Sequence, residues 1–233
     1  MSTLVSSQID TDHLPFGNLP VGSDVDTGIE TVADLVDRLG DIPLERIRMH
    51  PAPGTAVESD VIQMKLCELI DGVVVEKAMS FFESRLAIVL ATMIELYLRK
   101  NPVGFVVGAD AQTRTAPGRI RIPDVSFSRW EKTTDGTVPT EPIGPFAPEL
   151  AVEILSPGNT KREMTEKRRD LFAAGTQLIW ILDPKKKTVS VYRDVDDCRT
   201  IESDGALDGE ELLPGFSLSI QEWFEIAAGP RRG

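Results

Sequence analysis

The stretch ELAVEILSP (residues 149–157) decides the fold. Apart from its glutamates it is apolar up to a Ser-Pro-Gly break, which is typical of a central strand covered on both faces. Side chains alternate along a strand, so Glu153 shares a face with Ala151 and Leu155. An ionised glutamate in so apolar a strand is costly to bury unless a cation pairs with it. We therefore expect a lysine or a metal ion beside Glu153.

A basic helix is predicted directly after this strand. Residues 160–175 begin with the capping-box sequence TKRE and end at a glycine that suits a helix terminus. Met164, Lys167 and Leu171 recur at helical spacing, so Lys167 lies on or beside the stripe that packs onto the sheet. This arrangement predicts either a buried ion pair between Lys167 and Glu153 or a catalytic site that contains both.

A second carboxylate lies upstream, in the sequence IPDV (residues 122–125). We predict a single strand over residues 119–127 that carries Asp124. Carboxylates on two neighbouring strands, with a lysine nearby, can hold a divalent metal ion and activate water against a phosphodiester. The second carboxylate therefore favours the catalytic interpretation of Glu153 over a solitary buried ion pair.

The remaining pattern predicts an α/β or α+β fold with a mixed central sheet flanked by helices. Residues 68–75 form a hairpin signal that turns at Asp-Gly. Residues 80–100 predict a long helix whose packing face runs through Phe81, Ile88 and Leu98, and an Asn-Pro pair ends it. Helices are also expected before the hairpin. Further short strands are expected at residues 103–107, 111–115, 177–182 and 188–192.

The composition excludes several classes of enzyme. The chain has two histidines, His13 and His50, in polar or loop sequence, which argues against zinc hydrolases and Ser-His-Asp hydrolases. Its two cysteines, Cys67 and Cys198, fit no metal-knuckle spacing and indicate unpaired thiols in a reducing cytoplasm. No apolar run reaches the roughly 18–20 residues that a membrane span needs. We expect a cytoplasmic protein that works without a membrane.

The charge is unevenly distributed along the chain. The net charge is −12, but residues 61–193 hold 19 bases and 16 acids, and the acids are concentrated in the flanks. The middle of the chain is therefore compatible with DNA, although it is not strongly basic. The candidate phosphate contacts are Arg114, Arg119 and Arg121, which lie just before Asp124.

Several motifs together resemble the Uma family of putative restriction endonucleases, within the PD-(D/E)XK nuclease superfamily. Each motif alone is weak, but their succession over roughly residues 55–226 is fairly specific. The motifs are CELIDG (67–72), PDV (123–125), VEILSP (152–157), EKR (166–168), AAG (173–175), IWILDP (179–184) and LPGF (213–216).

The resemblance implies a restriction-endonuclease-like fold and assigns roles to four residues. Asp124 and Glu153 would bind Mg²⁺, for which Mn²⁺ would substitute. Glu68 would assist the metal ion or its water. The superfamily's lysine normally stands two residues after the second carboxylate, where this chain has Leu155. Lys167, on the following helix, is therefore the candidate that positions water or stabilises the transition state.

The activity implied by the resemblance is metal-dependent cleavage of DNA by a homodimer. The alternative is a catalytically inactive nuclease-fold protein that binds nucleic acid or a protein partner. We expect three segments: a flexible tail over residues 1–28, an N-terminal extension over residues 29–56, and the nuclease domain over residues 57–228.

Overall fold

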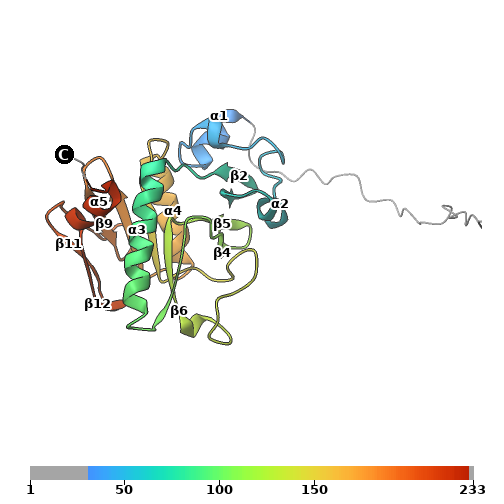
Figure 1. The fold of residues 1–233 in the computed structure, drawn as a ribbon. Coiled ribbons are helices and arrows are strands. Elements are labelled where there is room, and N and C mark those ends of the chain that lie inside the picture. Colours follow the sequence, from blue (N-terminus) through green and yellow to red (C-terminus); the bar gives the residue numbers. More distant parts are fainter. Residues whose placement is uncertain (1–30, 231–233) are drawn as a thin grey trace, which may run out of the picture.

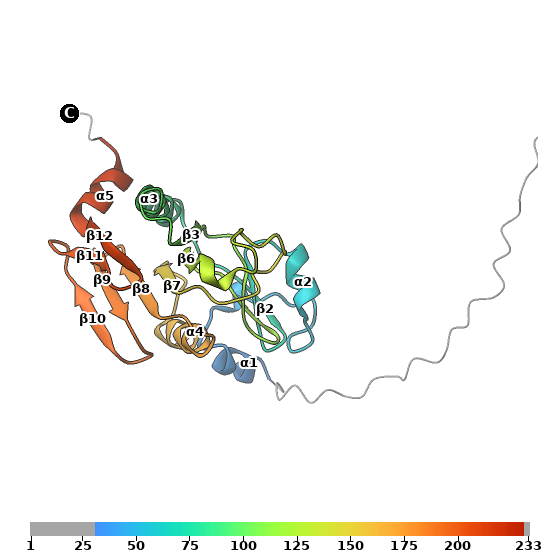
Figure 2. The ribbon, with the colours of Figure 1, turned by 90° about the horizontal axis from the view of Figure 1, so that it is seen from below.

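A computed structural model describes residues 31–230 (Figure 1). The predicted tail over residues 1–28, with His13, lies outside the described residues. A six-stranded sheet forms the centre, with α3 (Phe81–Leu98) on one face and α4 (Lys161–Ala173) on the other (Figures 1 and 2). This architecture confirms the predicted mixed sheet flanked by helices.

The central sheet is mixed because one of its strand pairs is parallel. β7 (Leu150–Ile154) and β8 (Leu178–Asp183) run parallel and are joined through α4, while the other neighbouring pairs are antiparallel. The strand order is β10-β9-β8-β7-β6-β3, in which the remaining strands are β3 (Gly104–Val107), β6 (Val125–Arg129), β9 (Thr188–Tyr192) and β10 (Cys198–Ile201).

A second, four-stranded sheet is built around the predicted hairpin. Its order is β2-β1-β5-β4, from β1 (Cys67–Ile70), β2 (Val73–Glu76), β4 (Thr113–Ala116) and β5 (Arg119–Arg121). The hairpin turns at Asp71 and Gly72, whose φ angles of 48° and 77° suit the two central positions of a tight hairpin turn. The short helices α1 (Val32–Arg38) and α2 (Glu58–Gln63) belong to this part of the chain. A single-turn helix, Leu44–Arg46, separates them.

The two faces of β7 bury different clusters. Leu150, Val152 and Ile154 pack in the large core that α3 shares with α5 (Ile220–Ala228) and the hairpin of β11 (Ala206–Gly209) and β12 (Leu213–Ser219). Ala151 packs on the opposite face with Met164 and Leu171 of α4. The alternation predicted for residues 149–157 is therefore confirmed, and Glu153 lies on the α4 face.

Two expectations about local structure are wrong. The single strand predicted over residues 119–127 is divided between β5 in one sheet and β6 in the other. Pro123 lies at the division and has no N–H for a ladder, so Asp124 directly precedes β6. Phe81 and Ile88 are 94% and 56% exposed, whereas Leu98 is buried as predicted. The helix packs through a face that contains Leu90 and Leu98.

Candidate active site

Asp124 and Glu153 lie side by side across the β6–β7 ladder. The backbone N–H of Asp124 donates to the carbonyl of Val152 at 2.8 Å, which continues the ladder beyond β6. The backbone N–H of Ile154 donates to Asp124 Oδ2 at 2.6 Å and fixes the carboxylate. Asp124 and Glu153 are 2% and 6% exposed. The two carboxylates predicted from the sequence therefore meet in the interior.

Lys167 contacts two of the candidate acids, Glu153 and Glu68. Its Nζ lies 2.8 Å from Glu153 Oε1 and 2.8 Å from Glu68 Oε1, and it donates to the carbonyl of Ile122 at 3.1 Å. Burial alone would lower the pKa of Lys167, but the charges of Glu153 and Glu68 outweigh burial and raise it. The ammonium is therefore a fixed positive charge between two carboxylates, as predicted for Lys167 and Glu153.

Glu68 is held from three sides. Besides Lys167, it accepts hydrogen bonds from Arg121 Nη1 at 2.9 Å and from the backbone N–H of Ile122 at 2.9 Å. Burial would raise the pKa of Glu68, but the charges of Lys167 and Arg121 outweigh burial and lower it to about 2. Arg121 also binds Asp170 of α4. Glu68 is therefore a buried partner that holds the Lys167 ammonium in place.

Lys77 is a further cation at this site that the sequence analysis did not predict. It directly follows β2, and its Nζ lies 2.7 Å from Asp124 Oδ1 and 3.4 Å from the carbonyl of Ala109. The side chains of Lys77 and Asp124 are 5% and 3% exposed. A lysine after a hairpin strand ordinarily points to solvent, so only the tertiary structure identifies this one.

Two carboxylate oxygens keep unused lone pairs. Asp124 Oδ1 and Glu153 Oε1 each lie close to an ammonium, yet neither contact has the angles of a hydrogen bond. Burial, together with the charge of Asp124, raises the pKa of Glu153 to about 7 against the opposing charges of Lys167 and Lys77. Two hard oxygen donors short of positive charge suit a divalent cation such as Mg²⁺. Water and a phosphate oxygen would have to complete its coordination, because residues 31–230 contain no cluster of three or more His, Cys, Asp or Glu placed to hold a metal ion.

The site surrounds a cavity of about 10 Å³, which is about the room that one water molecule needs. One wall is a separate ion pair in which both guanidinium Nη atoms of Arg46 contact the Glu163 carboxylate, at 2.7 and 3.0 Å. The residues that line the cavity are Arg46, Glu68, Lys77, Ala78, Asp124, Glu153, Ile154, Asn159, Glu163 and Lys167. A phosphodiester cannot enter unless this wall or a lysine moves.

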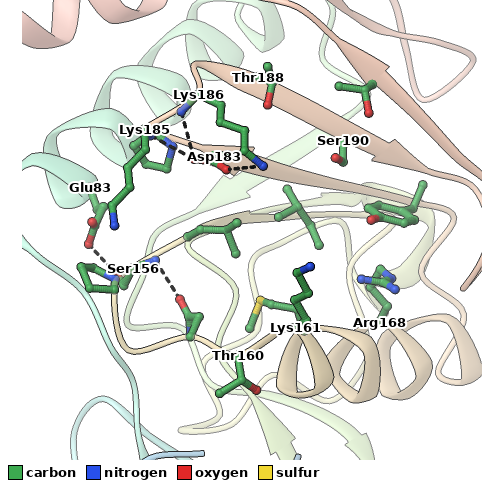
Figure 3. A pocket seen from close by; sticks show the side chains of 18 of the residues that line it. Glu83, Ser156, Thr160, Lys161, Arg168, Asp183, Lys185, Lys186, Thr188 and Ser190 are labelled. Carbon is green, nitrogen blue, oxygen red and sulfur yellow. Dashed lines mark hydrogen bonds and ion pairs between the residues drawn. The ribbon is translucent and has the colours of Figure 1, made fainter.

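A groove of about 970 Å³ lies beside the cavity and shares Asn159 with it. Figure 3 shows Lys185 and Lys186 of the β8–β9 turn on one side of the groove and Lys161 and Arg168 of α4 on the other. The groove is lined mainly by hydroxyl, amide and cationic groups, although three acids, Glu83, Asp183 and Glu202, also contribute to it.

The three arginines predicted to contact DNA all form ion pairs within the protein. Arg114 binds Glu58, and Arg119 binds Asp71 and Asp170. The side chain of Arg121 is 1% exposed. Contact with DNA stays a prediction for these residues.

Comparison with known proteins places this chain in a family. A family model described as "Uma2: Putative restriction endonuclease" matches residues 62–221. The chain belongs to the Uma2 family. The matched range includes Glu68, Asp124, Glu153 and Lys167. No match was found among curated proteins.

A solved structure shares the fold of this Uma2 chain. It is described as "a putative nuclease belonging to DUF820 from Anabaena variabilis ATCC 29413". The two chains are 24% identical, with a TM-score of 0.60 over 68% of this chain and 89% of the other. The likeness confirms the fold expected from the family resemblance. No helix within residues 31–230 is long and apolar enough to cross a membrane.

Proposed function

We propose that this Uma2 protein is a metal-dependent endonuclease that hydrolyses DNA phosphodiester bonds. The observation that carries the proposal is the meeting of Asp124, Glu153 and Lys167 in one buried cavity, with two carboxylate oxygens that lack hydrogen bonds. Each of these oxygens contacts a lysine ammonium, at 2.7 and 2.8 Å, as a charge contact without a hydrogen bond. A divalent cation could take over such a contact, because carboxylate oxygens are ligands that Mg²⁺ prefers.

The residues of the site would have different roles in the reaction. Asp124 and Glu153 would hold Mg²⁺, or Mn²⁺ in its place, through the two oxygens without hydrogen bonds. When bound, the metal ion would supply a Lewis acid that makes water more acidic and neutralises phosphate charge. Lys167 would hold attacking water or stabilise the charge that develops on the phosphate oxygens. Glu68 would keep the Lys167 ammonium aimed into the site.

The lysine on α4 supports activity despite the departure from the superfamily pattern. Leu155 stands where the superfamily has its lysine, yet the ammonium of Lys167 lies 2.8 Å from the second carboxylate. The positive charge is therefore supplied from the helix instead of the strand. The substrate strand would approach along the groove of Figure 3, whose cations could contact phosphates. One site cuts one strand, so we propose a homodimer for cleavage of both strands.

Cleavage of supercoiled plasmid and of mixed linear DNA, with Mg²⁺ and with Mn²⁺, tests the proposal. We expect nicking that Glu153→Ala and Lys167→Ala each reduce by at least about a hundred-fold, since even groups outside the metal ligands contribute 10–100-fold. Lys132→Ala is the control, because Lys132 also pairs with a buried glutamate, Glu149, but outside the cavity. Unfolding curves confirm that each variant is folded.

The outcomes separate the roles. Loss of nicking in Glu153→Ala alone would keep the nuclease and remove Lys167 from the catalytic residues. Absence of cleavage with either metal, by folded wild-type protein, would favour the catalytically inactive binding module instead.

A further inference from the structure

The cavity contains more carboxylate than cation. Arg46 and Glu163 satisfy each other, and Glu68 is paired with Arg121 from outside the cavity as well as with Lys167. Asp124 and Glu153 depend on the two lysines of the lining. The two lysines are not equivalent. Lys167 is shared between two carboxylates and a backbone carbonyl, whereas the close carboxylate contact of Lys77 is with Asp124 alone.

Lys77 covers the oxygen that a metal ion would need. Asp124 Oδ2 already accepts the backbone N–H of Ile154, so Oδ1 is the available donor, and the Lys77 ammonium lies 2.7 Å from it. The angles of that contact are not those of a hydrogen bond. The ammonium therefore acts as a point charge at the position that a metal ion bound to Asp124 Oδ1 would take, a role that suits lysine.

We infer that Lys77 is a built-in counter-cation that competes with the divalent metal ion for Asp124 Oδ1. With about 10 Å³ of room in the cavity, the ammonium and a hydrated metal ion cannot both occupy the space at this oxygen. Metal binding therefore requires Lys77 to leave, and the free energy of the broken contact lowers the affinity for the metal. Without metal, Lys77 keeps a buried aspartate from being an uncompensated charge.

The contacts of Lys77 allow such a release. Its backbone N–H donates to the carbonyl of Leu66 at 2.8 Å, so the backbone is held and release of the ammonium concerns the side chain alone. The other neighbour of the ammonium, the carbonyl of Ala109, lies at the long distance of 3.4 Å. Lys77 can therefore exchange one close partner without disturbing the Glu68–Lys167–Glu153 contacts.

Mn²⁺ titration of the full chain without DNA tests this inference, which rests on the proposed function. At pH 8 we expect Lys77→Met to bind Mn²⁺ about tenfold more tightly than wild type by calorimetry, which corresponds to about 1.4 kcal/mol. Lys132→Met is the matched control and should bind like wild type, because its glutamate partner lies outside the cavity. Asp124→Asn should abolish the binding.

Lysine acetylation of the wild-type protein, read by mass spectrometry, gives an answer that does not depend on a variant folding. Lys77 should be protected without metal and modified faster with Mn²⁺, while Lys167 stays protected in both states. An unchanged affinity in folded Lys77→Met, or unchanged labelling of Lys77 in protein that binds Mn²⁺, would overturn the inference alone. Absence of Mn²⁺ binding by wild-type protein would overturn the proposed metal-dependent activity as well.

Discussion

Two groups of buried charges share the walls of one cavity, and they differ in how completely they are satisfied. Arg46 donates to both oxygens of Glu163, to the carbonyl of Glu76 and to the carbonyl of Gly158. Glu163 also caps its own helix through the backbone N–H of Thr160. Asp124 and Glu153, in contrast, each keep an oxygen without a hydrogen bond.

The difference distinguishes a structural ion pair from a site that could take a ligand. A bidentate arginine pair in which all three guanidinium nitrogens donate gains its stabilisation within the fold. Point-charge contacts from lysines leave lone pairs free and can be exchanged for another cation. Burial raises the pKa of Glu153 to about 7, so this carboxylate remains short of positive charge even with Lys167 beside it.

The largest effect should come from breaking the structural pair. Arg46→Met would leave Glu163 buried without its cation, which should destabilise the protein by about 3–5 kcal/mol. Urea unfolding would show this as a lower midpoint at an unchanged slope. The pair of Arg114 and Glu58 is the control, because those side chains are 37% and 30% exposed. Arg114→Met should cost less than about 1 kcal/mol, and equal costs would contradict the distinction.

The structural pair could not be predicted from the sequence, although much around it could. The cap TKRE, the Asp71-Gly72 turn and the apolar strand around Glu153 are local signals and gave correct elements. Arg46 and Glu163 are 117 positions apart, and nothing local links them. The same holds for Lys77 and Asp124. Long-range charge pairing depends on how distant elements pack together, and that is decided by the tertiary structure.

The two wrong expectations have different causes. The alternation of residues 119–127 fits one strand, but Pro123 interrupts the ladder and lets the chain pass from one sheet to the other. In α3, apolar residues occur on more than one face, so periodicity could not choose between the faces of Ile88 and Leu90. The packing of α5 and β12 against α3 decides it.

Lowering the pH should show how much the cluster of Glu68 and Lys167 contributes to stability. The pKa of Glu68 is lowered to about 2, below its unfolded value. Ionised Glu68 therefore stabilises the folded protein at neutral pH, and this contribution is lost as the pH falls from about 4.5 toward 2. Wild-type protein should lose on the order of 3 kcal/mol more over this range than Glu68→Gln. Unfolding free energies measured by urea at several pH values check this.

Glu58→Gln provides the comparison for that measurement. Glu58 also has a lowered pKa, caused first by its hydrogen bond with Arg114, but it lies near the surface. Its replacement should change the acid dependence less than that of Glu68. Identical acid dependence in wild type and Glu68→Gln would mean that the buried cluster contributes no stabilisation at neutral pH.

The smallest expected effect is on DNA binding, and it comes from two exposed lysines at the groove. Lys185 and Lys186 lie exposed at the groove of Figure 3, where Lys186 is only 3.4 Å from the partly buried Asp183. If they contact phosphates, the double variant Lys185→Gln/Lys186→Gln should weaken DNA binding at every sequence. The slope of log affinity against log salt should fall by about one for each lysine. Fluorescence anisotropy with Ca²⁺ in place of Mg²⁺ would measure it.

The matched control keeps the same change in net charge. Lys65 and Lys100 are exposed and lie outside the groove, so Lys65→Gln/Lys100→Gln alters the overall field of the protein without touching the proposed strand path. A smaller salt slope in the groove variant alone would locate phosphate contacts there. Equal slopes in the two variants would mean that DNA responds only to net charge, and the groove would then lose its role as the path of the substrate.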